Sequence, residues 1–175
     1  EDAGKDPIAI VGSLRTKTKS NFRAGKSKYF IVEADEYQRH FLNLKPKILA
    51  ITNIDADHLD YYKNLKDIQN AFKELVSKIP ESGFLVCNPA DSKIRPVLKS
   101  AKCQIVDYTK IQEKIKLRFP GLHNIENAKA AFATAEILSI PEEKIIASLE
   151  NYQGTWRRFE FKGTSKTGAL VYDDY

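Results

Sequence analysis

The sequence predicts an α/β protein with a largely parallel sheet flanked by helices. Short apolar runs bounded by turn residues alternate with segments whose apolar residues recur every three or four positions, a pattern typical of parallel sheets. The length of 175 residues allows a sizeable buried core, and 42% hydrophobic with 29% charged residues is typical of a soluble globular chain. The expected strands are Ile8–Val11, Tyr29–Val32, Ile48–Thr52, Phe84–Cys87 and Gln104–Val106.

Three helices are expected between and after these strands. An apolar stripe predicts the first, which Pro80 and Gly83 close. Its members are Leu65, Ile68, Phe72, Leu75, Val76 and Ile79. The second begins near His123 and continues through the alanine-rich stretch 128–138, because alanine loses little side-chain entropy in a helix. The third follows Pro141, which fits the first turn of a helix.

The pattern changes after Gly154. Apolar residues flank the segment Gly163–Gly168 on both sides, which predicts a two-strand hairpin that opens another domain. We therefore expect one domain over residues 1–154 and the start of a second over residues 155–175. Because the sequence contains no methionine and ends in an expected strand, we expect it to be part of a longer chain.

Composition narrows the cellular setting. No apolar run approaches the roughly 20 residues of a membrane-spanning helix, and the N-terminus lacks the basic and apolar parts of a signal peptide. Cys87 and Cys103 have no Cys-x-x-Cys partner, so neither a zinc site nor a disulfide framework is indicated. We therefore expect a cytoplasmic protein. The net charge of +5 suits a phosphate-bearing partner, and the sequence carries no indication of oligomeric state.

Acidic residues follow two of the expected strands directly. The first strand leads into Glu33-Ala34-Asp35-Glu36, and the second leads into a segment that contains Asp55, Asp57 and His58. In open parallel sheets, ligands gather beyond the carboxyl ends of the strands. Glu33 and His58 are therefore candidate ligands of one divalent cation, with water and phosphate oxygens completing its shell. Glu33 is an ordinary ligand for Mg²⁺, whereas His58 is better suited to Mn²⁺.

A plainer interpretation of the same acids stays open. Asp and His are common in loops for conformational reasons. In this interpretation the acids are solvated loop residues or helix caps, and His58 is only hydrogen-bonded beside them. Asp55 and Asp57 do not belong to a calcium-binding loop, because its central glycine and distal glutamate are missing.

Four motifs follow one another along the chain. They are Glu33-Ala34-Asp35-Glu36-Tyr37 with Phe41-Leu42-x-Leu44-x-Pro46; Thr52-Asn53-Ile54-x-x-Asp57-His58-Leu59-Asp60; Gly121-x-His123-Asn124-x-x-Asn127-Ala128; and Gly154-x-x-Arg157-Arg158-Phe159-Glu160. In this order they resemble the central ATP-binding domain of the Mur ligases. The resemblance covers nearly all of the chain. It implies a domain like those of P-loop NTPases, followed by the first hairpin of a Rossmann-like C-terminal domain.

The resemblance also implies an activity. The form of Glu33–Tyr37 and the ending Asp173-Asp174-Tyr175 are similar to the family member that joins L-alanine to UDP-N-acetylmuramate in peptidoglycan precursor synthesis. That implies an ATP-dependent ligase with these two substrates and with no nucleic-acid or membrane partner. A ligase that recycles murein peptide is also similar, but is expected to have a longer segment between Phe41 and Pro46. Folylpolyglutamate synthase shares the architecture with less similar motifs.

The resemblance assigns roles at the nucleotide site. It implies that Glu33 and His58 hold the Mg²⁺ that accompanies ATP, and that Asn124 and Asn127 recognise adenine with His123 beside them. Asn124 and Asn127 are three residues apart and would share one helix face. Equally, Asn124 would only cap the helix that follows Gly121.

Two further residues have implied roles in the last motif. The motif implies that Arg158 is the phosphate contact. A guanidinium fork suits phosphate oxygens, but from chemistry alone either Arg157 or Arg158 could simply face water. Asp174 is implied to bind the ribose. Some relatives hold a second Mg²⁺ with a carbamylated lysine, for which Lys73 is a weak candidate beside the equally well aligned Phe72.

One expected part is missing and one stretch favours another function. No Gly-x-x-x-x-Gly-Lys-Thr phosphate loop is present, so we expect the fragment itself to be inactive. The basic stretch 15–28 suggests an alternative from another class, a non-catalytic module that binds nucleotides or nucleic acid. It contains few aromatic residues and no recognised nucleic-acid motif, so a solvated loop near the nucleotide-sugar is the better account.

Overall fold

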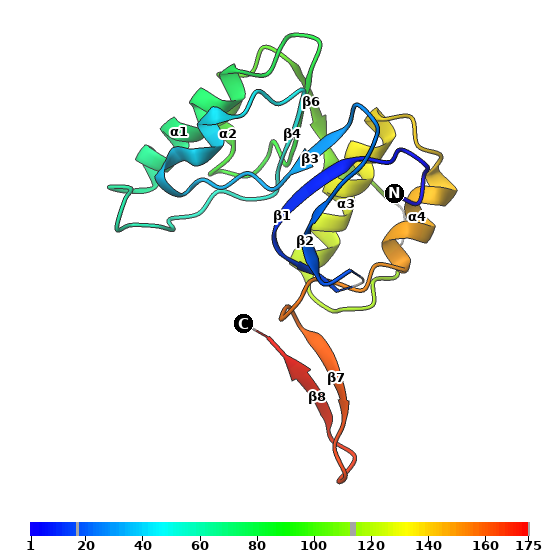
Figure 1. The fold of residues 1–175 in the computed structure, drawn as a ribbon. Coiled ribbons are helices and arrows are strands. Elements are labelled where there is room, and N and C mark those ends of the chain that lie inside the picture. The colour runs from blue at the N-terminus through cyan, green and yellow to red at the C-terminus, as the bar shows by residue number, and fades with distance from the viewer. Residues whose placement is uncertain (17, 113–114, 175) are drawn as a thin grey trace. The chain divides into compact units, whose positions relative to one another are not determined.

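The computed structural model describes residues 1–16, 18–112 and 115–174. These residues form two compact units (Figure 1). Unit 1 comprises residues 1–33, 115–121 and 143–175, and unit 2 comprises residues 34–114 and 122–142. The predicted α/β class is confirmed, with parallel strand pairing in both units.

Unit 1 contains a mixed three-stranded sheet in the order β2-β1-β3. Its strands are β1 (Ile8–Arg15), β2 (Ser20–Arg23) and β3 (Phe30–Val32). β1 is antiparallel to β2 and parallel to β3. The same unit holds most of α4 (Glu142–Glu150) and the antiparallel hairpin of β7 (Glu160–Thr164) and β8 (Leu170–Asp173). The predicted hairpin is thereby confirmed, while its assignment to a second domain stays a prediction.

The prediction that the basic stretch 15–28 is a solvated loop is wrong. Part of the stretch forms β2 and the end of β1. Arg15 Nη1 lies 2.5 Å from Glu1 Oε1, and Arg23 Nη2 lies 2.7 Å from Asp6 Oδ1. Carboxylates on the preceding segment neutralise these two arginines. The hydrogen bonds from the Lys26 amide and from Arg23 hold the pKa of Asp6 below its ordinary value.

Unit 2 is built around a parallel sheet in the order β4-β5-β6. The strands are β4 (Ile48–Ile51), β5 (Phe84–Cys87) and β6 (Gln104–Asp107), each within one or two residues of its predicted bounds. Its helices are η1 (Tyr37–Asn43), α1 (Leu65–Ser77), α2 (Arg95–Leu98), η2 (Tyr108–Lys110) and α3 (Leu122–Ile137). α1 and α3 confirm the first two predicted helices, and α4 confirms the third.

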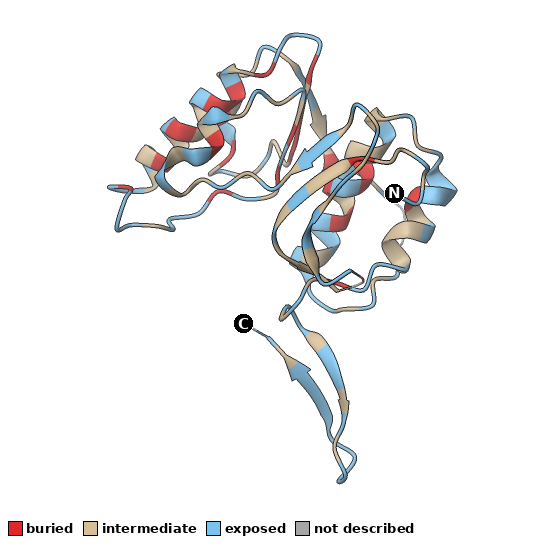
Figure 2. Ribbon diagram, in the orientation of Figure 1, coloured by how far each residue is buried: buried red, intermediate tan, exposed pale blue. Residues whose placement is uncertain are grey.

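The two faces of this sheet bury different helices, as the alternation of side chains along a strand requires. Leu85 and Cys87 of β5 pack with residues of α1 and α2 in one cluster. Val86, between them, packs with Tyr108 and with Ala130 of α3 in another. Figure 2 shows buried residues along α1 and in the strands of this sheet. Unit 2 is therefore a layer of parallel strands between two layers of helix.

Local chemistry sets where α1 and β5 begin. Asn64 precedes α1, and its side-chain oxygen accepts the Asp67 amide at 3.1 Å, which satisfies one of the unpaired donors of the first turn. Gly83 precedes β5, where a Cβ would lie 2.6 Å from the carbonyl oxygen of Lys47. Only glycine allows this close approach of two backbones.

Candidate nucleotide and metal site

Glu33 stands immediately after β3, as predicted, and its side chain turns back to β1. Oε2 of its carboxylate accepts the backbone N–H of Gly12 at 2.6 Å. The Glu33 residue is exposed to solvent. An exposed carboxylate held by one backbone amide can offer its remaining lone pairs to a cation.

The segment before β7 docks on the second half of the same strand. The Trp156 amide donates to the Leu14 carbonyl at 2.8 Å, and Thr155 forms a bridge with Arg15. The Arg158 amide then donates to the Thr155 carbonyl at 3.2 Å, which closes a turn. The structure therefore attaches both Glu33 and the turn that carries Arg158 to β1.

This turn has an unusual backbone. Arg157 and Phe159 have φ values of 55° and 49°, in the left-handed region that few residues other than glycine occupy. Asp174 helps to hold the turn, because its Oδ1 accepts the Phe159 amide at 3.1 Å. Asp173 lies 3.6 Å from Nε of Arg157. Strained backbone of this kind gathers at binding sites, which supports a functional hypothesis for the turn.

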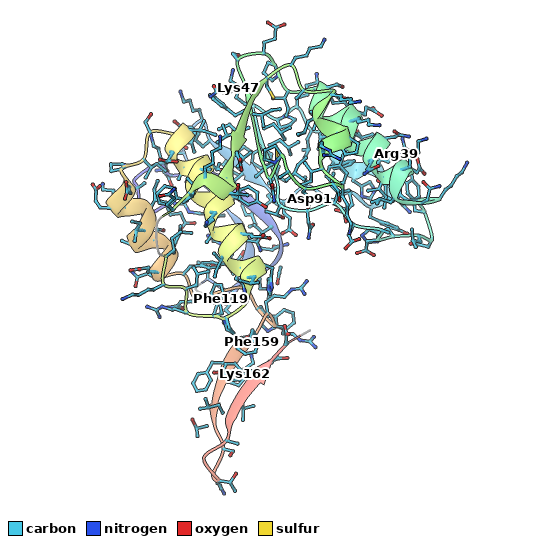
Figure 3. All side chains as sticks on the ribbon, turned by 180° about the vertical axis from the view of Figure 1, so that it is seen from behind. Arg39, Lys47, Asp91, Phe119, Phe159 and Lys162 are labelled. Carbon is cyan, nitrogen blue, oxygen red and sulfur yellow. The ribbon has the colours of Figure 1, made fainter. Side chains whose placement is uncertain are left out.

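An open cavity of about 800 Å³ lies beside the turn in unit 1. Aromatic side chains form part of its lining, namely Phe119 and Phe159 (both labelled in Figure 3), Phe161 and Tyr172. Arg118 also lines it, and Nε of Arg118 donates to the Glu150 carbonyl at 3.1 Å. Sequence reasoning missed Arg118 and Phe119, although only Pro120 separates them from the motif that begins at Gly121. Aromatic walls suit a flat apolar ligand.

His58 lies in unit 2, after β4, and is held on two sides. Its backbone is left-handed, with a φ of 53°, and its amide donates to Oδ1 of Asp57 at 2.7 Å. Nε2 of its ring lies 3.2 Å from Oε1 of Glu36. The Tyr37 ring lies 5.0 Å from the imidazole, centroid to centroid.

The other acids of these two loops have local partners. Asp35 Oδ2 lies 2.8 Å from Nδ1 of His40, and this hydrogen bond holds the pKa of Asp35 below its ordinary value. Asp60 accepts the Tyr37 hydroxyl at 3.1 Å, and Asp55 lies 2.8 Å from Nζ of Lys93. For these three acids the plainer interpretation, loop residues with local hydrogen bonds, fits the structure.

The residues implied to recognise adenine occupy the start of α3. Because α3 begins at Leu122, Asn124 lies in its first turn, and both of its predicted roles, adenine contact and helix cap, stay predictions. Asn124 and Asn127 are three residues apart on one α-helix and share a face, and His123 and Asn127 are exposed. Lys73 on α1 donates to Asn70 at 3.1 Å, and Phe72 packs against Phe41.

Comparison with known proteins assigns the family. The model of the Mur ligase middle domain matches residues 14–114, more than half of the chain. The chain belongs to the Mur ligases. The UDP-N-acetylmuramate--L-alanine ligase of Clostridium acetobutylicum is 40% identical over 97% of this chain. The match covers 43% of that relative, so the chain spans less than half the length of this Mur ligase.

Solved Mur ligases have the same fold. A UDP-N-acetylmuramate-alanine ligase from Thermotoga maritima superposes with a TM-score of 0.81 at 24% identity, over 99% of this chain and 45% of that one. The MurF ligase of Thermotoga maritima, solved in complex with ADP, gives a TM-score of 0.69 at 13% identity, over 97% of this chain and 47% of that one. These structural similarities confirm the fold class predicted for this chain.

The donors present fit a divalent cation that keeps most of its shell for other ligands. Among residues 1–16, 18–112 and 115–174, no group of three or more His, Cys, Asp or Glu side chains is arranged to hold a metal. Mg²⁺ beside a nucleotide takes one or two carboxylates and completes its shell with water and phosphate. The exposed Glu33 carboxylate meets that requirement in chemistry. Taken by itself, the His58 imidazole is a donor better suited to Mn²⁺ than to Mg²⁺. No helix in the described part of the chain is long and apolar enough to cross a membrane.

Proposed function

We propose that the chain is the central, ATP-binding part of a ligase that joins L-alanine to UDP-N-acetylmuramate in the peptidoglycan precursor pathway of the cytoplasm. The observation that carries this proposal is the 40% identity to a protein of that name across 97% of the chain. The four ordered motifs support it independently, because they extend from Glu33 to Glu160. The activity belongs to the longer protein, of which these residues are one part.

The proposed reaction forms an amide in two steps. The lactyl carboxylate of UDP-N-acetylmuramate attacks the γ-phosphate of ATP, which gives an acyl phosphate and ADP. The amine of L-alanine then attacks the acyl carbon, and phosphate leaves. No nucleophilic side chain is required, so the protein contributes positioning and charge compensation. The cation, when bound, supplies positive charge to the phosphate oxygens.

Three side chains are proposed to act at the reacting phosphate. Glu33 and His58 bind the divalent cation, and Arg158 contacts phosphate oxygens with its guanidinium group. The attachment of Glu33 and of the Arg158 turn to one strand, at Gly12 and Leu14, supports a shared role for these two residues. The left-handed backbone of His58 supports a functional role for that residue.

The remaining proposed contacts hold the nucleoside. Asn124 and Asn127 recognise adenine, with His123 beside them, and Asp174 binds the ribose. The exposure of Asn127 and His123 at the start of α3 supports this assignment. ADP in the complex of the Thermotoga maritima MurF ligase supports ATP as the nucleotide.

The alternative of a nucleic-acid-binding module is disfavoured by two contacts. Two arginines of the basic stretch, Arg15 in β1 and Arg23 in β2, are both paired with carboxylates. Paired arginines release fewer counterions on binding a polyanion, so the salt dependence expected of such a module is weakened.

Turnover by the full-length protein tests the proposal. With ATP, UDP-N-acetylmuramate and Mg²⁺ present, phosphate release should require L-alanine, and Mg²⁺ removal by chelation should abolish it. L-Alanine should be preferred to the tripeptide that a murein-recycling ligase would accept. Preference for the tripeptide, or ATP turnover that needs neither amino acid nor muramyl nucleotide, would contradict the proposal.

A further inference from the structure

The Glu33 carboxylate takes the place of a backbone acceptor in the sheet of unit 1. β1 and β3 pair in parallel as far as Ile10 and Val32, and the Glu33 amide donates to the Ile10 carbonyl at 2.9 Å. In a continued parallel ladder the next β1 amide facing β3, that of Gly12, would donate to a β3 carbonyl. It donates instead to Oε2 of Glu33 at 2.6 Å. A side-chain oxygen of Glu33 therefore replaces the backbone acceptor where the pairing of the two strands ends.

Residue 12 has little room for a side chain beside this carboxylate. A Cβ at Gly12 would lie 3.1 Å from Oε1 of Glu33 and 3.3 Å from both Cδ and Oε2, which is tighter than most Cβ contacts. The backbone itself does not require glycine, because Gly12 is not among the residues with positive φ. The position of the Glu33 carboxylate is therefore what favours glycine at this point.

We infer that Gly12 is a positioning residue, whose amide and missing side chain fix the direction of the Glu33 carboxylate toward the divalent cation. This inference rests on the proposed role of Glu33 as a metal ligand. Glu33 is exposed, so without this bond its side chain would sample several rotamers. Partners that orient a metal ligand in this way typically change metal affinity by about 10–100-fold when they are lost.

A double-mutant cycle in the full-length protein tests the inference. The variants are Gly12→Ala, Glu33→Gln and the two combined, and the measurement is Mn²⁺ affinity by electron paramagnetic resonance in the presence of ADP. Gly12→Ala should weaken Mn²⁺ binding about tenfold or more. On the Glu33→Gln background it should add no further loss, because both changes act through the same carboxylate.

The outcomes separate the inference from the proposed function. Unchanged Mn²⁺ affinity in Glu33→Gln would remove the proposed metal role of Glu33, and with it the basis of the inference. If Glu33→Gln weakens binding and Gly12→Ala does not, the inference is overturned while the proposed metal site stands. An equal loss from Gly12→Ala on both backgrounds also overturns it, because Gly12 would then act through another group.

A matched control and a second readout complete the test. Ile10→Ala is the control. Ile10 is the preceding residue on the same face of β1 and is 40% exposed, so this substitution should leave Mn²⁺ affinity unchanged. The second readout is NMR, which requires no substitution at residue 12. Mg²⁺ added with ADP should shift the Gly12 amide resonance in the unmodified protein but not in Glu33→Gln. Absence of that shift in the unmodified protein would overturn the inference even if Gly12→Ala does not fold.

Discussion

The hydroxyl of Tyr62 donates a hydrogen bond to the backbone carbonyl of Glu36 at 2.5 Å. Tyr62 is buried in the core of unit 2, where burial raises the pKa of its hydroxyl above the ordinary value. Glu36 lies in the loop after Glu33, and its carboxylate contacts His58. A core side chain therefore fixes the backbone that places the partner of a proposed metal ligand.

Replacing Tyr62 by phenylalanine should destabilise unit 2. The substitution keeps the buried ring and removes only the donor, so the Glu36 carbonyl loses its partner at an expected cost of about 1–3 kcal/mol. Urea unfolding followed by the circular dichroism of the helices measures this cost. Tyr61→Phe is the control, because Tyr61 is 43% exposed. Equal stability of the two variants would contradict the prediction.

The sequence predicted the fold best where burial sets the pattern. α1 and β5 were located closely because most of the apolar residues of one helix stripe and one strand are buried. β2 was missed because Ser20–Arg23 contains one apolar residue, Phe22, which is exposed. Its place in the sheet depends on pairing with β1 and on the contacts of Arg23 with acids far away in the sequence. Local periodicity contains no information about such pairs.

The sequence predicted which residues belong to the candidate site, but it did not predict the contacts that hold those residues. The motifs indicated Glu33 and His58, but nothing in their spacing indicated Gly12 or Glu36 as the groups that hold them. Gly12 belongs to none of the four motifs, which begin at Glu33. Its role depends on the distance between two neighbouring strands, which only the folded chain defines.

Removing the cap of α1 should weaken its first turn. Asn64→Ala deletes the oxygen that accepts the Asp67 amide, at an expected cost of about 1 kcal/mol. Hydrogen exchange of the first-turn amides should accelerate accordingly, roughly fivefold. Asn64→Asp retains an acceptor and should exchange at nearly the original rate. Unchanged exchange in Asn64→Ala would show that water replaces the cap without loss.

Stability should fall in alkaline solution because the Cys87 thiol ionises more readily in the unfolded chain than in the folded one. Burial, the main cause, raises the pKa of Cys87 from 9.0 to about 11 in the folded chain. A group whose folded pKa is raised stabilises the fold fully below its unfolded pKa, and this contribution is lost as pH rises through the folded pKa. The window is therefore from about pH 9 to about pH 11. The free energy of unfolding in urea should decline more gently with pH in Cys87→Ala than in the unmodified protein, and equal slopes would contradict this prediction.

Asp174 should discriminate between nucleotides that have and lack a ribose hydroxyl. One carboxylate oxygen, Oδ1, accepts the Phe159 amide at 3.1 Å, and the proposed ribose contact falls to the other oxygen. A hydrogen bond to a charged group typically contributes about 1.5–3 kcal/mol, so Asp174→Ala in the full-length protein should weaken ATP binding by roughly tenfold or more. Binding of 2′-deoxy-ATP or 3′-deoxy-ATP, whichever lacks the contacted hydroxyl, should weaken less. If Asp174 only holds the Arg157–Phe159 turn, both deoxynucleotides should lose affinity as much as ATP does. Equilibrium titration with the three nucleotides separates the two roles, because the turn is shared by all of them and the hydroxyl is not.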